Sequence, residues 1–241
     1  MEVIKINRED KEFPERLLSI KKCPSIIYAI GDINLLNSKY TVGIVGSRNC
    51  TEYGIRVTNE FSKKLSQKGL CVISGMAVGI DGVAHNSAIN EIGKTIAVLG
   101  GGFNHISPEE NEWLFHKILK NGGCLISEYS LDELPDKNNF PVRNRLISGL
   151  SDAILVTEAE HRSGSSITVK YANEQGKTVY AIPSNIYSYA GIGTNRMIQE
   201  GAILATKPEQ IIADIVKSKL NNTDDNKQTS REERKSYNKS R

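Results

Sequence analysis

Hydrophobic and polar residues alternate along the chain in two distinct patterns. Nearly continuous apolar runs such as TVGIVG and TIAVLGGG predict strands that are buried on both faces. Amphipathic stretches of helical length separate these runs, which predicts consecutive β-α-β units with right-handed crossovers. The expected fold class is therefore α/β, with a doubly wound, mostly parallel sheet. Strands are expected at 41–46, 70–75, 95–102, 124–128, 152–159 and 178–183, and helices at 51–68, 79–91, 109–120, 142–150, 165–175 and 208–219.

Three parts of the chain differ in this pattern. Residues 1–40 predict a short lead segment that packs on the core, with a small helix near 13–20 and a strand in SIIYAIG that extends the sheet edge. Residues 41–219 carry the regular alternation and should form the main domain. Residues 220–241 have almost no apolar side chains and cannot bury enough surface to become ordered, so we expect a disordered, polar and basic tail.

The charge distribution limits how a nucleic acid could be bound. The formal net charge is +3, but residues 217–241 hold eight Lys/Arg against four Asp/Glu, a balance of +4, which leaves −1 on the preceding part. An anionic partner must therefore meet a local pocket and not a broad basic face. No apolar run approaches the ~20 residues needed to cross a bilayer, and the N-terminus is charged, so we expect a cytoplasmic protein.

Glycine and serine stand at nearly every predicted strand end. In an open α/β sheet, ligands bind beyond the carboxyl ends of the strands, and small residues there let the backbone and the N–H groups of the next helix approach a phosphate. Turns of this composition also serve tight connections alone, but their repetition favours an anion site. The candidate residues of this kind are Gly46, Ser47, Gly75, Ala77, Gly79, Gly101, Ser163, Gly164, Ser165 and Ser166.

Cations and an aromatic ring accompany these strand ends. Arg48 follows the first predicted strand by one small loop and precedes a helix, so its guanidinium can reach the crevice and pair with a phosphate. Arg143 and Arg145 flank Asn144 just after Phe140, a combination that suits a backbone phosphate and a stacked base. Alternate residues on a helix do not share a face, so one of the two arginines is expected to pair inside the fold, with Glu128 or Glu158 as partner.

Several common site types are not supported. The Gly-Lys-Thr triplets at 93–95 and 176–178 lack the earlier glycine of an ATP-binding loop, and no complete GxGxxG is present. Asp81 and His85 share a helical face, and we interpret them as a hydrogen-bonded structural pair. The four cysteines are widely spaced and predict reduced, mostly buried thiols. We expect no metal, no cofactor and no enzymatic activity, because no nucleophile–base arrangement can be assembled.

Taken together, the blocks GIVGSR, SGMAVGIDGVAH, TIAVLGGG, LISE, FPVRNRLISGLSDAILVTEA, SGSSITVKYANEQGKTVYAIP and GTNRMIQEGA resemble the DprA/Smf DNA-processing family in order and spacing. The resemblance covers roughly residues 13–215. It implies an extended Rossmann-like fold that binds single-stranded DNA, forms a homodimer and loads the RecA recombinase during transformation, competence or recombination. The family's winged-helix C-terminal module and upstream helical domain have no counterpart in this sequence, and Ser107 stands where a tyrosine is usual.

Two alternatives remain beside the DNA-binding hypothesis. Rossmann-like phosphoribohydrolases are similar in fold, and would use a Gly-rich loop with Glu128 or Glu158 on a ribose. Their usual PGG-x-GT loop is missing from EAEHRSGSSIT, which favours the DNA binder. A sensor in phage defence that shares the fold is the other alternative.

Overall fold

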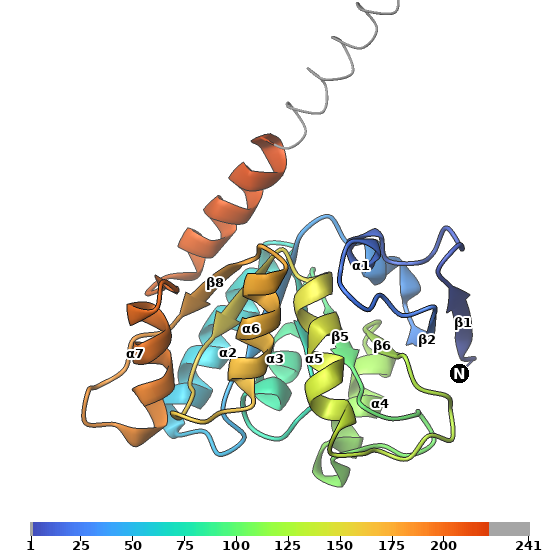
Figure 1. Ribbon diagram of the computed structural model, residues 1–241, viewed down its shortest axis with the longest axis horizontal. Helices are drawn as coiled ribbons and strands as arrows, with labels where there is room; N and C mark the ends of the chain where they lie inside the picture. Colours follow the sequence, from blue (N-terminus) through green and yellow to red (C-terminus); the bar gives the residue numbers. More distant parts are fainter. Residues whose placement is uncertain (1, 222–241) are drawn as a thin grey trace, which may run out of the picture.

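The computed structural model describes residues 2–221, and the predicted disorder of the tail falls almost entirely outside them. Within this range one nine-stranded sheet has the order β1-β2-β6-β5-β4-β3-β7-β8-β9. All neighbours pair in parallel except β1 with β2 and β2 with β6 (Figure 1). The strands are β1 (Ile4–Asn7), β2 (Ile26–Gly31), β3 (Thr41–Val45), β4 (Cys71–Ser74), β5 (Thr95–Val98), β6 (Cys124–Ser127), β7 (Ala153–Val156), β8 (Thr178–Ala181) and β9 (Ile203–Leu204).

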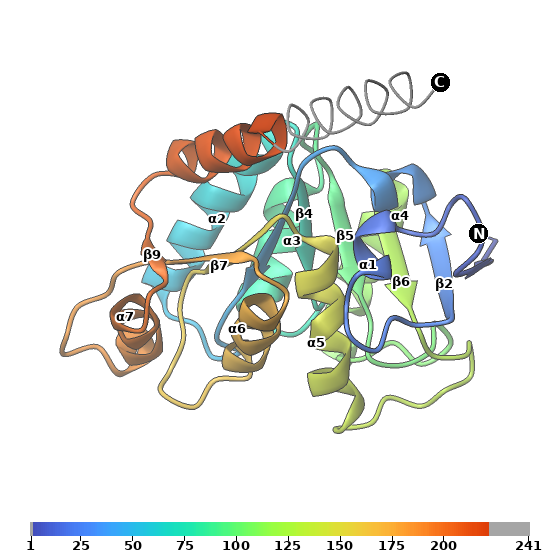
Figure 2. The same cartoon turned by 45° about the horizontal axis from the view of Figure 1, so that its top comes forward.

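Helices cover both faces of the sheet, as the buried strands require (Figure 2). One face packs against the helices that follow β3, β4 and β5 and against the C-terminal helix, and the other packs against the remaining helices. No helix within residues 2–221 is long and apolar enough to span a membrane. The helices are α1 (Glu15–Leu18), α2 (Glu52–Gln67), α3 (Ile80–Ala88), α4 (Glu112–Lys120), α5 (Asn139–Leu150), α6 (Ser165–Glu174), α7 (Ile192–Gln199) and a helix over 208–221.

The predicted α/β fold class is confirmed, and all six predicted parallel strands are present. Helix α5 starts three residues earlier than predicted, which places Phe140 and Pro141 in its first turn. Proline is tolerated there because the first N–H groups of a helix have no intrahelical partner. Helix α7 and strand β9 were not predicted, since their apolar stretches are short. On α4, Trp113 is more than half exposed, whereas Phe115 is buried.

Strand order reverses between β3 and β7, because the chain runs from β3 out to β6 and then returns to pair β7 with β3. Loops after these two strands therefore diverge to opposite faces and leave a crevice at the carboxyl edge. This geometry positions the candidate site.

Candidate functional site

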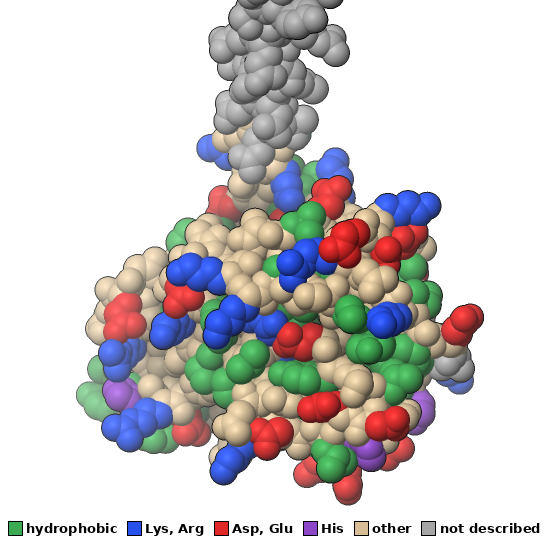
Figure 3. Space-filling model, turned by 45° about the vertical axis from the view of Figure 1, so that its right-hand side comes forward, with side chains coloured by type: hydrophobic (Ala, Val, Ile, Leu, Met, Phe, Trp, Pro, Cys, Tyr) green, Lys and Arg blue, Asp and Glu red, His purple; other side chains and the backbone are tan. Residues whose placement is uncertain are grey.

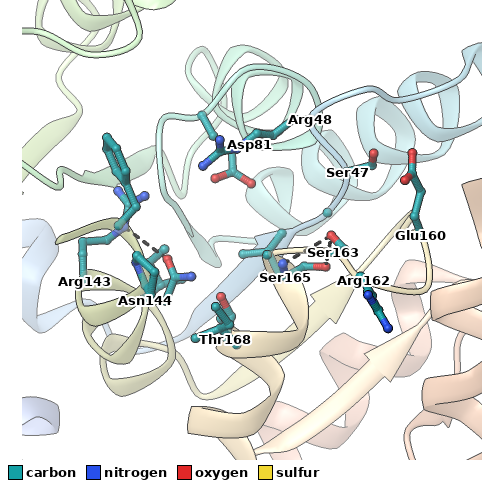
Figure 4. Close-up of a pocket in the computed structure, with 18 of the residues that line it drawn as sticks. Ser47, Arg48, Asp81, Arg143, Asn144, Glu160, Arg162, Ser163, Ser165 and Thr168 are labelled. Carbon is teal, nitrogen blue, oxygen red and sulfur yellow. Dashed lines mark hydrogen bonds between the residues drawn. The ribbon is translucent and has the colours of Figure 1, made fainter. Parts of the chain in front are cut away.

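A pocket of about 530 Å³ lies at this reversal point, beyond the carboxyl ends of β3, β4 and β7 (Figure 4). Four segments line it: the loop after β3, the turn from β4 into α3, the start of α5 and the loop that leads into α6. Of the predicted residues, those that line the pocket are Gly46, Ser47, Arg48, Ala77, Phe140, Arg143, Asn144, Ser163, Gly164 and Ser165. Those that do not are Gly75, Gly79, Gly101, Arg145 and Ser166.

The loop after β3 is fixed by its neighbours on both sides. The Ser47 N–H donates to the Glu158 carbonyl at 2.8 Å, and the Ile80 N–H donates to the Ser47 carbonyl at 3.1 Å. Gly79 has a φ of 80°, and an added Cβ there would lie 2.4 Å from the Ser47 oxygen. Gly79 therefore supports the pocket from behind, since only glycine permits this conformation and approach. Arg48, the next residue in the loop, is left exposed at the rim.

Glu158 holds the start of the following helix. Its buried carboxylate accepts hydrogen bonds from the Thr51 N–H at 2.7 Å and from the Thr51 hydroxyl at 2.6 Å. Thr51 is the N-cap of α2, and its hydroxyl also accepts from the Gly54 N–H. The Glu158 carboxylate is thus engaged in holding β7, the loop after β3 and α2 together.

The pocket floor contains a buried charge pair, Arg143 and Asp81. The Arg143 guanidinium donates to the Gly75 carbonyl at 2.7 Å and to the Val98 carbonyl, and so ties the ends of β4 and β5 to α5. The Asp81 carboxylate accepts from the Gly75 N–H at 3.1 Å. Burial lowers the pKa of Arg143 to about 10 and raises the pKa of Asp81, while each opposes the shift of the other. Because its N–H and its carbonyl bond to these two side chains, Gly75 lies beneath the pocket and does not line it.

Arg145 has an internal role. It forms a bidentate ion pair with Glu128, with two nitrogen–oxygen distances of 2.5 Å, and is buried away from the pocket. This confirms the expectation that one of the two arginines pairs with a glutamate inside the fold. Which of the two arginines forms this pair depends on the direction in which each side chain leaves α5 and on the position of Glu128. The sequence alone did not supply either.

The rim carries three exposed cations, Arg48, Lys137 and Arg162. None of them forms an ion pair within residues 2–221, although Glu160 also lines the pocket. Lys137 and Arg162 were missed by the sequence reasoning. Each precedes a named candidate by one to three residues, Phe140 and Ser163, so a search for cations beside the candidate loops would have found them. Figure 3 shows Lys/Arg and Asp/Glu side chains interspersed over one face, so this face is not a broad basic surface.

The loop into α6 brings two serine side chains together beside Gly164, the N-cap residue of the helix. The Ser165 hydroxyl donates to the Ser163 hydroxyl oxygen at 2.8 Å, and the Ser165 N–H donates to the same oxygen at 3.3 Å. The next two N–H groups, of Ser166 and Ile167, donate to the Ser163 and Gly164 carbonyls at 3.0 and 3.2 Å, so only the positive end of the helix dipole favours an anion here. Ser166 lies just outside the lining, and the Gly101 backbone packs against Pro135.

The predicted hydrogen bond between Asp81 and His85 is wrong, although both residues are structural. Asp81 accepts from Gly75, whereas His85 Nδ1 lies 2.6 Å from the Thr95 hydroxyl oxygen. Because Thr95 donates its own proton to the Val72 carbonyl, His85 Nδ1 must be the donor in this bond. Burial, followed by the charge of Arg143, lowers the pKa of His85 to about 3 and keeps the ring neutral.

Comparison with known proteins identifies the family. A family model described as DNA recombination-mediator protein A matches residues 5–216. The chain belongs to this family. DNA processing protein DprA of Bacillus subtilis (strain 168) is 42% identical over 206 residues, which cover 85% of this chain and 69% of that protein. Protein Smf of Escherichia coli (strain K12) is 43% identical over 207 residues, which cover 86% of this chain and 55% of that protein.

A solved structure of a DNA processing protein A agrees with the fold described above. The structure of DNA processing protein A from Helicobacter pylori, described for its single-stranded DNA binding mode, superposes with a TM-score of 0.79 at 28% identity. It covers 90% of this chain and 97% of that one. The resemblance to the DprA/Smf family noted in the sequence is thereby confirmed, and the Rossmann-like fold with it.

Proposed function

We propose that this member of the recombination-mediator family binds single-stranded DNA in the pocket between β3 and β7. The observation that carries the proposal is the arrangement of charge. Arg48, Lys137 and Arg162 are exposed around a concave site, whereas the charged side chains of its floor already bind other groups of the protein. Exposed cations around a groove track a phosphate backbone, and their attraction depends on salt. A solved relative described for single-stranded DNA binding supports the same ligand.

The shape and lining of the pocket favour a single strand. Phe140 is half-buried in the lining and lies beside Asn144 on α5. An aromatic face next to phosphate-binding cations lets an unpaired base stack without sequence preference. In a duplex the bases already stack on one another and offer no free face to the ring. We therefore expect oligo-dT to bind more tightly than the corresponding duplex.

The positions of the carboxylates argue against a phosphoribohydrolase on the same fold. Glu128 pairs with Arg145 and Glu158 binds Thr51, so neither carboxylate is free to hold a ribose hydroxyl. Within residues 2–221 no group of three or more His, Cys, Asp and Glu side chains could hold a metal ion. A non-enzymatic role in handling DNA fits these features best.

The test is a salt titration of a labelled oligo-dT with the wild-type chain and the Arg48→Ala variant. Loss of one phosphate contact should weaken binding and lower the slope of log K against log salt by about 0.7. Lys120→Ala, an exposed cation at the end of α4, is the matched control and should change neither quantity. Unchanged affinity and slope in Arg48→Ala would overturn the DNA pocket, and release of base from a nucleoside monophosphate would favour the enzyme.

The biological role extends this proposal: in the cytoplasm a homodimer would load RecA on single strands. Family membership as a recombination mediator supports this role. The measurement is RecA-dependent ATP hydrolysis on DNA that is already covered by a single-strand binding protein. The chain should shorten the lag in this assay and Arg48→Ala should not. An unchanged lag with the wild-type chain would contradict loading and would instead favour the sensor hypothesis.

A further inference from the structure

The segment over residues 184–191, between β8 and α7, presents large apolar side chains to the solvent. We call it the aromatic loop. Ile186, Tyr187 and Tyr189 are 76%, 91% and 65% exposed, and they stand close together in the chain. Single exposed apolar residues are common, but a group of this size at one loop tip marks an interaction surface.

The aromatic loop is a defined structure that holds its tyrosines outward. Asn195 closes its base, because its side chain accepts from the Ser184 N–H at 2.9 Å and donates to the Ser184 carbonyl at 2.9 Å. At the tip, the Asn185 side chain accepts from the Tyr187 N–H at 2.9 Å. A Cβ added at Gly191 would lie 2.0 Å from the Ser184 hydroxyl oxygen, so the two ends of the loop are in close contact.

The loop is continuous with the pocket through the segment that leads into α6. The Gly193 N–H, at the start of α7, donates to the Ala159 carbonyl at 2.7 Å, and the Arg196 guanidinium lies 3.1 Å from His161 Nε2. Arg162 follows directly and lines the pocket. Figures 1 and 2 both show α7 beside the segment that enters α6, with the aromatic loop on the outer side of α7.

Cations border this path. Arg162 is exposed at the pocket end, and Arg196 is exposed on α7, where it also pairs with Glu200 at 2.7 Å. Exposed aromatic rings beside arginines provide the two contacts that an unpaired strand needs, since bases stack on the rings and phosphates meet the cations. A protein partner would match the apolar side chains but would have no need of the two arginines that lie between the pocket and the loop.

We propose that the aromatic loop is a second contact for single-stranded DNA: the strand leaves the pocket past Arg162 and stacks its bases on Tyr187 and Tyr189. This path rests on the proposed function of the pocket. It implies a binding site longer than the pocket itself and an affinity that increases with strand length until the strand reaches the loop.

The test compares a trinucleotide, which fills the pocket, with an oligo-dT of about twenty nucleotides, which reaches the loop. Replacing Tyr187 and Tyr189 together by alanine should lower the affinity for the long strand about fivefold or more per lost stacking contact. The affinity for the trinucleotide should not change. The matched double replacement by phenylalanine keeps the rings and should restore binding. A Tyr187→Trp variant should lose fluorescence with the long strand only, while the native Trp113 on α4 gives the background.

The outcomes separate the two proposals. If Arg48→Ala lowers the affinity for both ligands and the double alanine variant binds the long strand like wild type, the proposed path is wrong and the proposed pocket is retained. If Arg48→Ala changes neither ligand, the pocket itself fails. If the alanine pair alters the sedimentation coefficient without altering DNA affinity, the loop joins copies of the chain or binds another protein, and the path is overturned.

Discussion

The floor and the rim of the pocket hold similar side chains that do opposite work. On the floor, Arg143 and Asp81 are buried and use their polar atoms on Gly75 and Val98, so their charges organise the ends of β4 and β5. On the rim, Arg48 is exposed and makes no ion pair within residues 2–221. The difference teaches that an arginine near a strand end is defined by what its nitrogen atoms already bind and not by its position in a motif.

Removal of the floor arginine should have the largest effect. Arg143→Ala leaves Asp81 buried without its cation and two strand-end carbonyls without a donor, so we expect a loss of about 3–5 kcal/mol in the free energy of unfolding. Urea denaturation followed by circular dichroism measures it. The rim variant Arg162→Ala should stay within about 0.5 kcal/mol of wild type. Equal stability of the two variants would abolish the distinction between floor and rim.

The buried histidine next to the floor predicts a dependence of stability on pH. The folded pKa of His85 is about 3 and the unfolded value is near 6.5, so the unfolded chain takes up a proton that the folded chain refuses. The contribution of neutral His85 to the free energy of unfolding is fully present above about pH 6.5. It is lost as the pH falls below that value, at up to ~1.4 kcal/mol per pH unit. Asp81, whose pKa is raised, acts in the opposite sense at lower pH.

A replacement of His85 isolates this effect. His85→Asn keeps a donor in place of Nδ1 for Thr95 but cannot take up the proton. The difference in unfolding free energy between pH 7 and pH 5 should therefore be smaller in the variant than in wild type, as measured by urea titration at both pH values. An identical decrease in both proteins would assign the acid sensitivity to other groups.

The six strands β3 to β8 were predictable from sequence because they are largely buried apolar runs, and the site location followed from the rule for doubly wound sheets. The rim was predicted only in part. Arg48 lies in the short loop after β3, whereas Arg162 reaches the pocket through a loop that the hydrogen bond from Gly193 to Ala159 holds in place. The pairing of Arg145 with Glu128 depends on a contact between distant segments, and no local pattern encodes it.

The smallest expected effect on stability belongs to the remaining rim cations. Replacing Lys137 and Arg162 together by alanine should change the unfolding free energy by well under 1 kcal/mol, because both side chains are exposed and unpaired within residues 2–221. The same change should lower the salt slope of oligo-dT binding by about 1.4, at roughly 0.7 for each lost phosphate contact. Fluorescence anisotropy across a salt series measures the slope, and Lys120→Ala serves again as control. Replacing a floor residue cannot give this result, because its loss lowers the stability of the fold. If the rim cations instead stabilised the fold, the double replacement would lower the unfolding free energy and leave the salt slope unchanged.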